Sequence, residues 1–172
     1  LAALLGSPMG RLRRLEYRGY DSAGISVVEN STLNSVKSLG KLQALETRLV
    51  EAPVHGRLGI GHTRWATHGV PSEANSHPHF DDQQEIAVVH NGIIEDYQEL
   101  GAELRAQGVQ FRSETDTETV AHLIRHYYDG DLFAAVKRAL QDVKGAYAVG
   151  VICKDNPDVL IAARHGSPLI VG

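Results

Sequence analysis

The sequence predicts an α+β fold built on antiparallel sheets. Strand-like segments follow one another through short connections, helix-like segments cluster between two groups of strands, and strands and helices do not alternate regularly. The length of 172 residues, with 42% hydrophobic and 22% charged residues, suits one globular domain whose core needs neither disulfides nor a structural metal. We therefore expect a single domain.

The first third of the chain is expected to form a β-hairpin, a helix and a third strand. Asn30-Ser31 provides the hairpin turn, and leucines at intervals of three and four give the helix one apolar face. Residues 1–15 also have apolar side chains at helical spacing, although Gly6, Pro8 and Gly10 interrupt it. The expected elements are strands at 22–28, 33–38 and 57–65 and a helix at 41–51.

A long polar stretch, residues 66–84, follows the third strand. It is rich in Thr, His, Pro, Ser, Asn and Asp and has almost no aliphatic residues. Long ordered loops of compact domains are usually functional, so we expect a large loop that contributes to a site.

The second half begins with a strongly apolar strand and continues through three helices to two β-rich segments. Gly108 ends the first helix, Ser113 or Thr115 is the candidate cap of the second, and Asp131 starts the third. The expected elements are strands at 85–94, 146–154 and 159–171 and helices at 97–107, up to 128 and from 131.

Composition excludes several classes of function. With 17 basic and 21 acidic residues the net charge is -4, which offers no basic stripe for nucleic acid. No apolar run approaches the roughly 18 residues of a membrane span. Neither a P-loop motif nor a dinucleotide-binding motif occurs. We expect a protein with no nucleic-acid or membrane partner.

Cysteine usage indicates the compartment. Cys153 is the single cysteine, so there is no internal disulfide framework, and a reducing compartment fits. The basic cluster at residues 11–14 follows the apolar start of the chain, which is the reverse of a signal peptide. We expect a cytoplasmic protein, with Cys153 as a buried, inert thiol in an apolar strand.

Residues 62–69 place a guanidinium, an indole, two hydroxyls and two imidazoles at the end of a strand and the start of a loop. Arg64 can bind a carboxylate through two parallel hydrogen bonds. The alternative is that Arg64 pairs with a surface acid while Trp65 fills the core. Asn91-Gly92 is likewise open to two interpretations, a type I′ hairpin turn or a pair of donors for an oxyanion.

Residues 113–118 are by default a capped helix N-terminus, with Asp116 as a candidate ligand for an ammonium group. Histidines near the polar loop raise the question of a metal site. The absence of HExxH and CxxC motifs disfavours it, and a His-based metal hydrolase is only a third hypothesis. The histidines concerned are His68, His77, His79 and His90.

Five motifs in order resemble the glucosamine-6-phosphate synthase family, also called isomerising glutamine:fructose-6-phosphate aminotransferases. The resemblance runs from about residue 11 to residue 172, and five linked motifs are far more specific than one. The motifs lie at residues 16–24, 62–69, 90–95, 113–118 and 166–169.

The resemblance implies a fold and a reaction. The fold is the αββα sandwich of N-terminal-nucleophile hydrolases, two antiparallel sheets covered by helices. In the family, the thiolate of a first-residue cysteine attacks the side-chain amide of L-glutamine, its own α-amino group acts as the base, and no cofactor is needed. Ammonia then reaches fructose 6-phosphate in an isomerase domain, which is absent from these residues, and the whole protein forms a homodimer.

The resemblance also assigns roles. Arg64 binds the α-carboxylate of glutamine, Asp116 binds its α-ammonium group, and Asn91 and Gly92 form the oxyanion hole. The residues around them are Arg18 and Gly19 beside the nucleophile, Thr67 and His68 in the pocket, Trp65 at the passage of ammonia, and His77 in a loop that closes over glutamine.

One departure from the family concerns the nucleophile. Leu1 cannot replace the cysteine that is the first residue in the family, and we expect that cysteine and the strand it begins, about 5–6 residues or slightly more, to be absent from this chain. The rival hypothesis is therefore a catalytically inactive fragment that still binds glutamine.

Overall fold

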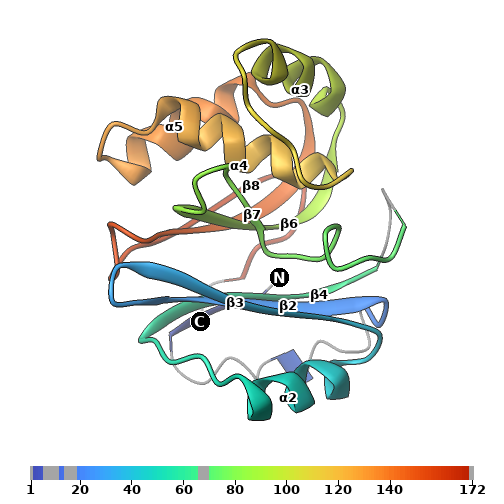
Figure 1. Ribbon diagram of the computed structural model, residues 1–172. Helices are drawn as coiled ribbons and strands as arrows, with labels where there is room; N and C mark the ends of the chain where they lie inside the picture. Colours follow the sequence, from blue (N-terminus) through green and yellow to red (C-terminus); the bar gives the residue numbers. More distant parts are fainter. Residues whose placement is uncertain (1, 6–11, 14–18, 66–69, 171–172) are drawn as a thin grey trace.

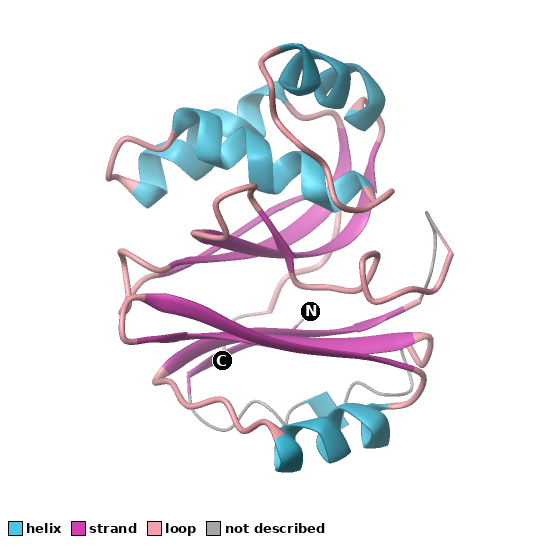
Figure 2. Cartoon of the chain, in the orientation of Figure 1, coloured by secondary structure: helices cyan, strands magenta, loops and turns pink. Residues whose placement is uncertain are grey.

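The computed structural model describes residues 2–5, 12–13, 19–65 and 70–170. Helix α2 covers the outer face of one sheet, and helices α3, α4 and α5 cover the outer face of a second (Figure 1). The two sheets lie face to face between these helical layers, as the secondary-structure view shows (Figure 2). This is an α+β fold, as the sequence pattern predicts, in the αββα arrangement that the family resemblance implies.

The first sheet has the strand order β1-β4-β2-β3, with antiparallel pairing throughout. Asn30 and Ser31 have φ angles of 50° and 57°, the conformation that a two-residue hairpin turn requires. The hairpin expected there is confirmed. The strands are β1 Ala2–Leu5, β2 Ser22–Glu29, β3 Thr32–Leu39 and β4 Leu58–Arg64.

Strand β1 differs from the helical spacing seen in residues 1–15. Its residues pair with β4 from Ala2 opposite Gly61 to Leu5 opposite Leu58. Pairing satisfies backbone groups along an edge of β4, and this outweighs a helical spacing that glycines and a proline already interrupt. Only residues 12–13 of this segment are described as helical.

The second sheet has the order β5-β6-β7-β8, again antiparallel. Strand β5 lies inside the stretch expected to be a loop, because two residues pair with Ala87 and Val88 without any local β pattern. Strand β8 ends well before residue 171, since Gly166 has a φ of 72° and Pro168 follows. The strands are β5 His79–Phe80, β6 Ile86–Ile94, β7 Gly145–Cys153 and β8 Leu160–His165.

The four helices agree closely with the sequence expectations. Asp131 caps α5, because its carboxylate accepts a hydrogen bond of 3.0 Å from the Ala134 amide. Thr115 occupies the N-cap position of α4 but makes no side-chain capping bond. The helices are α2 Leu42–Glu51, α3 Tyr97–Ala106, α4 Asp116–Tyr127 and α5 Leu132–Asp142.

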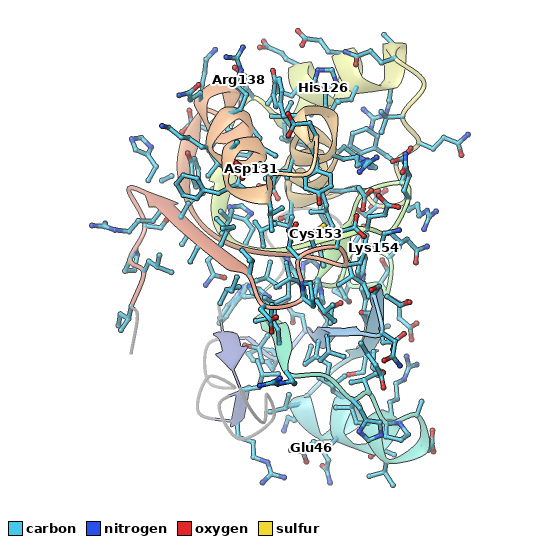
Figure 3. The ribbon with its side chains drawn as sticks, turned by 90° about the vertical axis from the view of Figure 1, so that its left-hand side faces the viewer. Glu46, His126, Asp131, Arg138, Cys153 and Lys154 are labelled. Atoms are coloured by element: carbon cyan, nitrogen blue, oxygen red, sulfur yellow. The ribbon has the colours of Figure 1, made fainter. Side chains whose placement is uncertain are left out.

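Three apolar clusters hold the layers together. The central one joins Leu58 and Ile60 of β4 to Ala87 and Val89 of β6, between the two sheets. The others fill the spaces under α2 and under α3–α5. Cys153 on β7 is fully buried, and Figure 3 shows it in the interior. None of the helices described in the chain is long and apolar enough to cross a membrane.

Candidate active site

Strand β4 carries two buried polar side chains toward the second sheet. Side chains alternate along a strand, so His62 and Arg64 share the face of Ile60, which packs between the sheets. Both are 4% exposed. Arg64 is therefore not a surface residue, and the part of the alternative interpretation in which Trp65 fills the core is wrong. Trp65 is 60% exposed.

His62 connects the two sheets at this level. Its Nε2 atom lies 2.7 Å from Oδ1 of Asn91 on β6. Burial lowers the pKa of His62 to about 3, so the imidazole is neutral near pH 7. An amide oxygen can only accept, so Nε2 carries the hydrogen and donates it. This bond fixes the orientation of the Asn91 amide. Its Oδ1 atom points toward β4, and its Nδ2 donor points the other way.

Asn91-Gly92 is not a hairpin turn, because both residues lie within β6. Asn91 is paired with Ala148 and Gly92 with Tyr147 of β7. Gly92 has a φ of 136°, and a Cβ built there would lie 2.0 Å from the Ala146 carbonyl oxygen. Only glycine fits this conformation and approach. The type I′ interpretation is therefore wrong.

Asp116 begins α4 beside the end of β6. Its Oδ2 accepts a hydrogen bond of 3.0 Å from the Ile94 amide, and its Oδ1 one of 3.3 Å from the Thr117 hydroxyl. The side chain is buried, and His90 Nδ1 lies 3.9 Å from it. Burial lowers the pKa of Arg64, whereas the negative charges of Asp21 and Asp116 oppose this shift. A guanidinium and this carboxylate thus act on each other across the layers.

The turn before β2 packs against the end of β4. A Cβ on Gly19 would lie 2.6 Å from the Arg64 carbonyl carbon, so a larger residue would displace the strand end. The Asp21 amide donates to the Arg64 carbonyl oxygen over 3.2 Å. Tyr20 lies with its ring centroid 5.5 Å from that of Trp65. Together they form an exposed aromatic pair at the edge of this region.

His77 lies deep between the sheets and is buried. Its ring centroid is 4.2 Å from that of His62 and 4.8 Å from that of His79. Burial lowers the pKa of His77 and of His79 well below the usual value, so all three imidazoles are neutral. Among residues 2–5, 12–13, 19–65 and 70–170, no group of three His, Cys, Asp or Glu side chains is placed to hold a metal.

The structure thus brings Arg64, Asn91 and Asp116 to the region where the ends of β4, β6 and α4 meet. Gly19 and Gly92 lie there with them, as does His77 through its contact with His62. The remaining expected site residues, Arg18, Thr67 and His68, lie outside the described residues. His62 was missed by sequence reasoning as a partner of Asn91, because nothing local links positions on two sheets.

Comparison with known proteins identifies the family. A family model described as a glutamine amidotransferase domain matches residues 62–171. The chain belongs to the glutamine amidotransferase domain family. Among the solved structures similar to this amidotransferase domain is the glutamine phosphoribosylpyrophosphate amidotransferase of B. subtilis. It superimposes with a TM-score of 0.71 at 30% identity, over 83% of this chain and 31% of that one.

A class-II glutamine aminotransferase domain protein of Silicibacter pomeroyi shares the fold. Its TM-score is 0.61 at 16% identity, over 88% of this chain and 77% of that one. The 30%-identical B. subtilis structure confirms the N-terminal-nucleophile αββα fold expected for this amidotransferase domain.

Curated relatives of the amidotransferase domain include two isomerizing glutamine–fructose-6-phosphate aminotransferases. The one from Clostridium perfringens is 55% identical over 94% of this chain and 26% of its own length. The one from Symbiobacterium thermophilum is 56% identical over 95% of this chain and 27% of its own length. The chain spans about a quarter of the length of these relatives.

Proposed function

We propose that this amidotransferase domain hydrolyses the side-chain amide of L-glutamine, and that the full-length protein passes the ammonia to fructose 6-phosphate to form glucosamine 6-phosphate. The observation that carries the first part is the convergence of Arg64, Asn91 and Asp116. The second part is supported by the two relatives named glutamine–fructose-6-phosphate aminotransferases.

The three groups suit the two ends of glutamine. Arg64 binds the α-carboxylate through its planar pair of donors, and Asp116 binds the α-ammonium group. A neighbouring anion and cation in one region match a zwitterion, because each charge of the ligand meets its opposite. We assign Trp65 to the route of ammonia, and His77, Thr67 and His68 to the binding of glutamine.

Asn91 and Gly92 stabilise the negative charge that develops on the substrate during the reaction. When a nucleophile attacks the amide carbon, the carbonyl oxygen becomes an oxyanion, and the Asn91 amide and the Gly92 N–H donate to it. His62 preorganises Asn91 by holding its Oδ1, so the donor does not have to reorient as charge develops. The neutral state of His62 prevents a buried positive charge at this position.

The nucleophile is not Cys153. This thiol is 0% exposed, and burial raises its pKa, so it is neither accessible nor ionised near neutral pH. We propose that the full-length protein supplies the nucleophile and that Arg18 and Gly19 act beside it. For residues 1–172 alone, the buried state of their sole cysteine favours a second function, binding of glutamine without turnover. Calorimetry with glutamine, beside a glutamate-release assay, separates binding from hydrolysis.

The oxyanion assignment is tested by replacing Asn91 with Ala in the full-length protein. The kcat for glutamate release should fall about 100- to 1,000-fold, because one preorganised donor is lost, while the KM for glutamine stays near that of the parent. Asn34→Ala, on the β2–β3 hairpin, is the matched control and should leave kcat unchanged. Full activity of Asn91→Ala would remove this assignment.

Compartment and oligomeric state are proposed from the cysteine usage and from the family resemblance. We place the protein in the cytoplasm, where a single reduced cysteine is stable, and expect the full-length enzyme to be a homodimer. Size-exclusion chromatography with light scattering on the full-length protein tests the dimer.

A further inference from the structure

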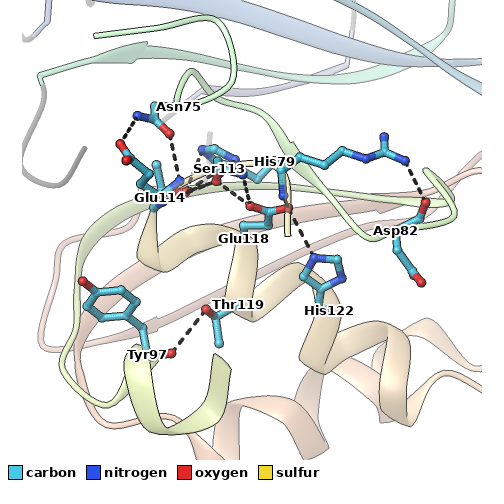
Figure 4. A network of polar contacts seen from close by, with 11 residues as sticks. Asn75, His79, Asp82, Tyr97, Ser113, Glu114, Glu118, Thr119 and His122 are labelled. Atoms are coloured by element: carbon cyan, nitrogen blue, oxygen red, sulfur yellow. Dashed lines mark hydrogen bonds and ion pairs between the residues drawn. The ribbon is translucent and has the colours of Figure 1, made fainter. Parts of the chain in front are cut away.

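A network of partly buried polar contacts lies beside the proposed glutamine site (Figure 4). It joins two segments that are far apart in sequence, residues 70–78 after β4 and residues 112–115 before α4. The first leads to His77 and the second to Asp116. Neither segment is held by a long run of sheet pairing, so side chains must fix their relative positions.

Glu118 anchors the second segment from within α4. Its carboxylate accepts hydrogen bonds from the Arg112 amide at 2.7 Å and from the Ser113 amide and hydroxyl, each at 2.6 Å. Burial raises the pKa of Glu118, but hydrogen bonds from His122, Ser113 and Arg112 outweigh burial and lower it to about 2. Glu118 is therefore ionised, and residues 112–113 are tied to the helix that Asp116 begins.

Asn75 joins the first segment to the second. Its Oδ1 accepts from the Glu114 amide over 2.9 Å, and its Nδ2 donates to the Glu114 carboxylate over 3.2 Å. The same Nδ2 donates to the Val70 carbonyl oxygen over 2.9 Å, so the amide also joins the two ends of residues 70–75. Asn75 is 2% exposed. One buried amide thus uses both its acceptor and its donors.

We propose that Asn75 is a positioning residue of the glutamine site, which holds the loop of His77 in register with Asp116. The pair of hydrogen bonds between Asn75 and Glu114, called the clasp below, lies close to both residues in the sequence. Asn75 is two residues before His77, and Glu114 is two residues before Asp116. This role rests on the proposed function, because it acts through the residue that binds the α-ammonium group. Asn75 itself touches no reacting atom.

Only an amide of this length fits the clasp. Aspartate has the same shape but no donor, so it loses the bonds to Val70 and to the Glu114 side chain and places two carboxylates together. A buried donor or acceptor left without its partner is costly, so the two segments should move apart. The α-ammonium site should suffer more than the oxyanion hole, which belongs to β6.

The test uses the full-length protein and the variant Asn75→Asp. The KM for L-glutamine and the inhibition constant of L-glutamate should each rise about tenfold, whereas kcat should change less than about twofold. The inhibition constant of glutarate, which lacks only the α-amino group, should change less than about twofold. A general loss of structure would raise both inhibition constants together.

Asn34→Asp is the matched control. Asn34 also donates through Nδ2 to a glutamate, Glu29 Oε2 at 2.7 Å, but on the distant hairpin. It should leave the KM, kcat and both inhibition constants unchanged. Thermal unfolding of every variant checks the fold. If Asn75→Asp does not fold, the same constants are measured for Glu118→Gln, which weakens the hydrogen bonds that hold residues 112–113 to α4.

Two results would overturn the role of Asn75. Equal rises for L-glutamate and glutarate would show a structural effect without relation to the α-ammonium group, and an unchanged KM would show no effect on the site. A parent protein that releases no glutamate would instead refute the proposed function, and the role of Asn75 would fall with it.

Discussion

Acidification from pH 7 to pH 5 should destabilise this domain through three buried histidines. Burial lowers the pKa of His62 to about 3 and those of His77 and His79 well below the usual value. In the unfolded chain each imidazole titrates near pH 6.5. Below that pH the unfolded state binds protons at these imidazoles and the folded state does not, so the free energy of unfolding falls.

The magnitude follows from these shifts. The contribution of the three neutral imidazoles to the free energy of unfolding is fully present above pH 6.5 and is lost as the pH falls toward their folded-state pKa values. Between pH 7 and pH 5 each histidine removes about 2 kcal/mol, and three remove about 6 kcal/mol. This is comparable with the whole stability of an ordinary domain, about 5–15 kcal/mol. The domain should be close to unfolding at pH 5.

Two buried carboxyl groups act in lower pH windows. Glu118, with a pKa lowered to about 2, contributes stability that is lost only as the pH falls below about 4.5. Burial raises the pKa of Asp81 above its usual value of 3.8, so the folded state binds this proton before the unfolded chain does, and this opposes the loss of stability at pH values above 3.8. The histidines therefore dominate between pH 7 and pH 5.

Urea unfolding followed by circular dichroism at both pH values measures the effect. His79→Gln, with a side chain that does not titrate, should lose about 2 kcal/mol of the pH dependence. Equal stability at pH 7 and pH 5, or a His79→Gln variant with the full dependence of the parent, would refute the reasoning.

Two further predictions concern packing. Gly92→Ala should destabilise the domain by about 3 kcal/mol or more, because its Cβ would meet the Ala146 carbonyl oxygen. Gly108→Ala, with a φ of 92° and open space around it, should cost only about 1–2 kcal/mol. Thermal unfolding compares the two variants, and equal losses of stability would contradict a role for the Ala146 contact. Cys153 should not react with a thiol reagent in the native state and should react fully in urea; rapid native labelling would contradict its burial.

Local patterns sufficed for most of the fold. Leucine spacing located α2, the apolar run located β6, and Asn30-Ser31 located the first hairpin, since each signal lies within the element itself. Strand β5 could not be found, because two residues pair with β6 only after the chain has folded back. Strand β1 was obscured by helical spacing, and its pairing with β4 is likewise nonlocal.

The candidate site was predictable in its residue types but not in its arrangement. The motifs identified Arg64, Asn91 and Asp116, yet the hairpin interpretation of Asn91-Gly92 failed because a strand can contain such a pair when the glycine φ is positive. His62 and Asn75 act through partners 29 and 39 residues away, and no sequence spacing indicates such contacts.

Release of the deamidated amino acid by the full-length protein tests the central claim most directly, with glutamate measured from L-glutamine and aspartate from L-asparagine at equal substrate concentrations. If Arg64 and Asp116 fix the α-carbon and Asn91 receives the oxyanion, L-glutamine should be hydrolysed. L-asparagine, shorter by one methylene group, should not place its carbonyl oxygen at Asn91 and should react at least about 100-fold more slowly. Absence of hydrolysis, or equal rates for both amides, would contradict the account.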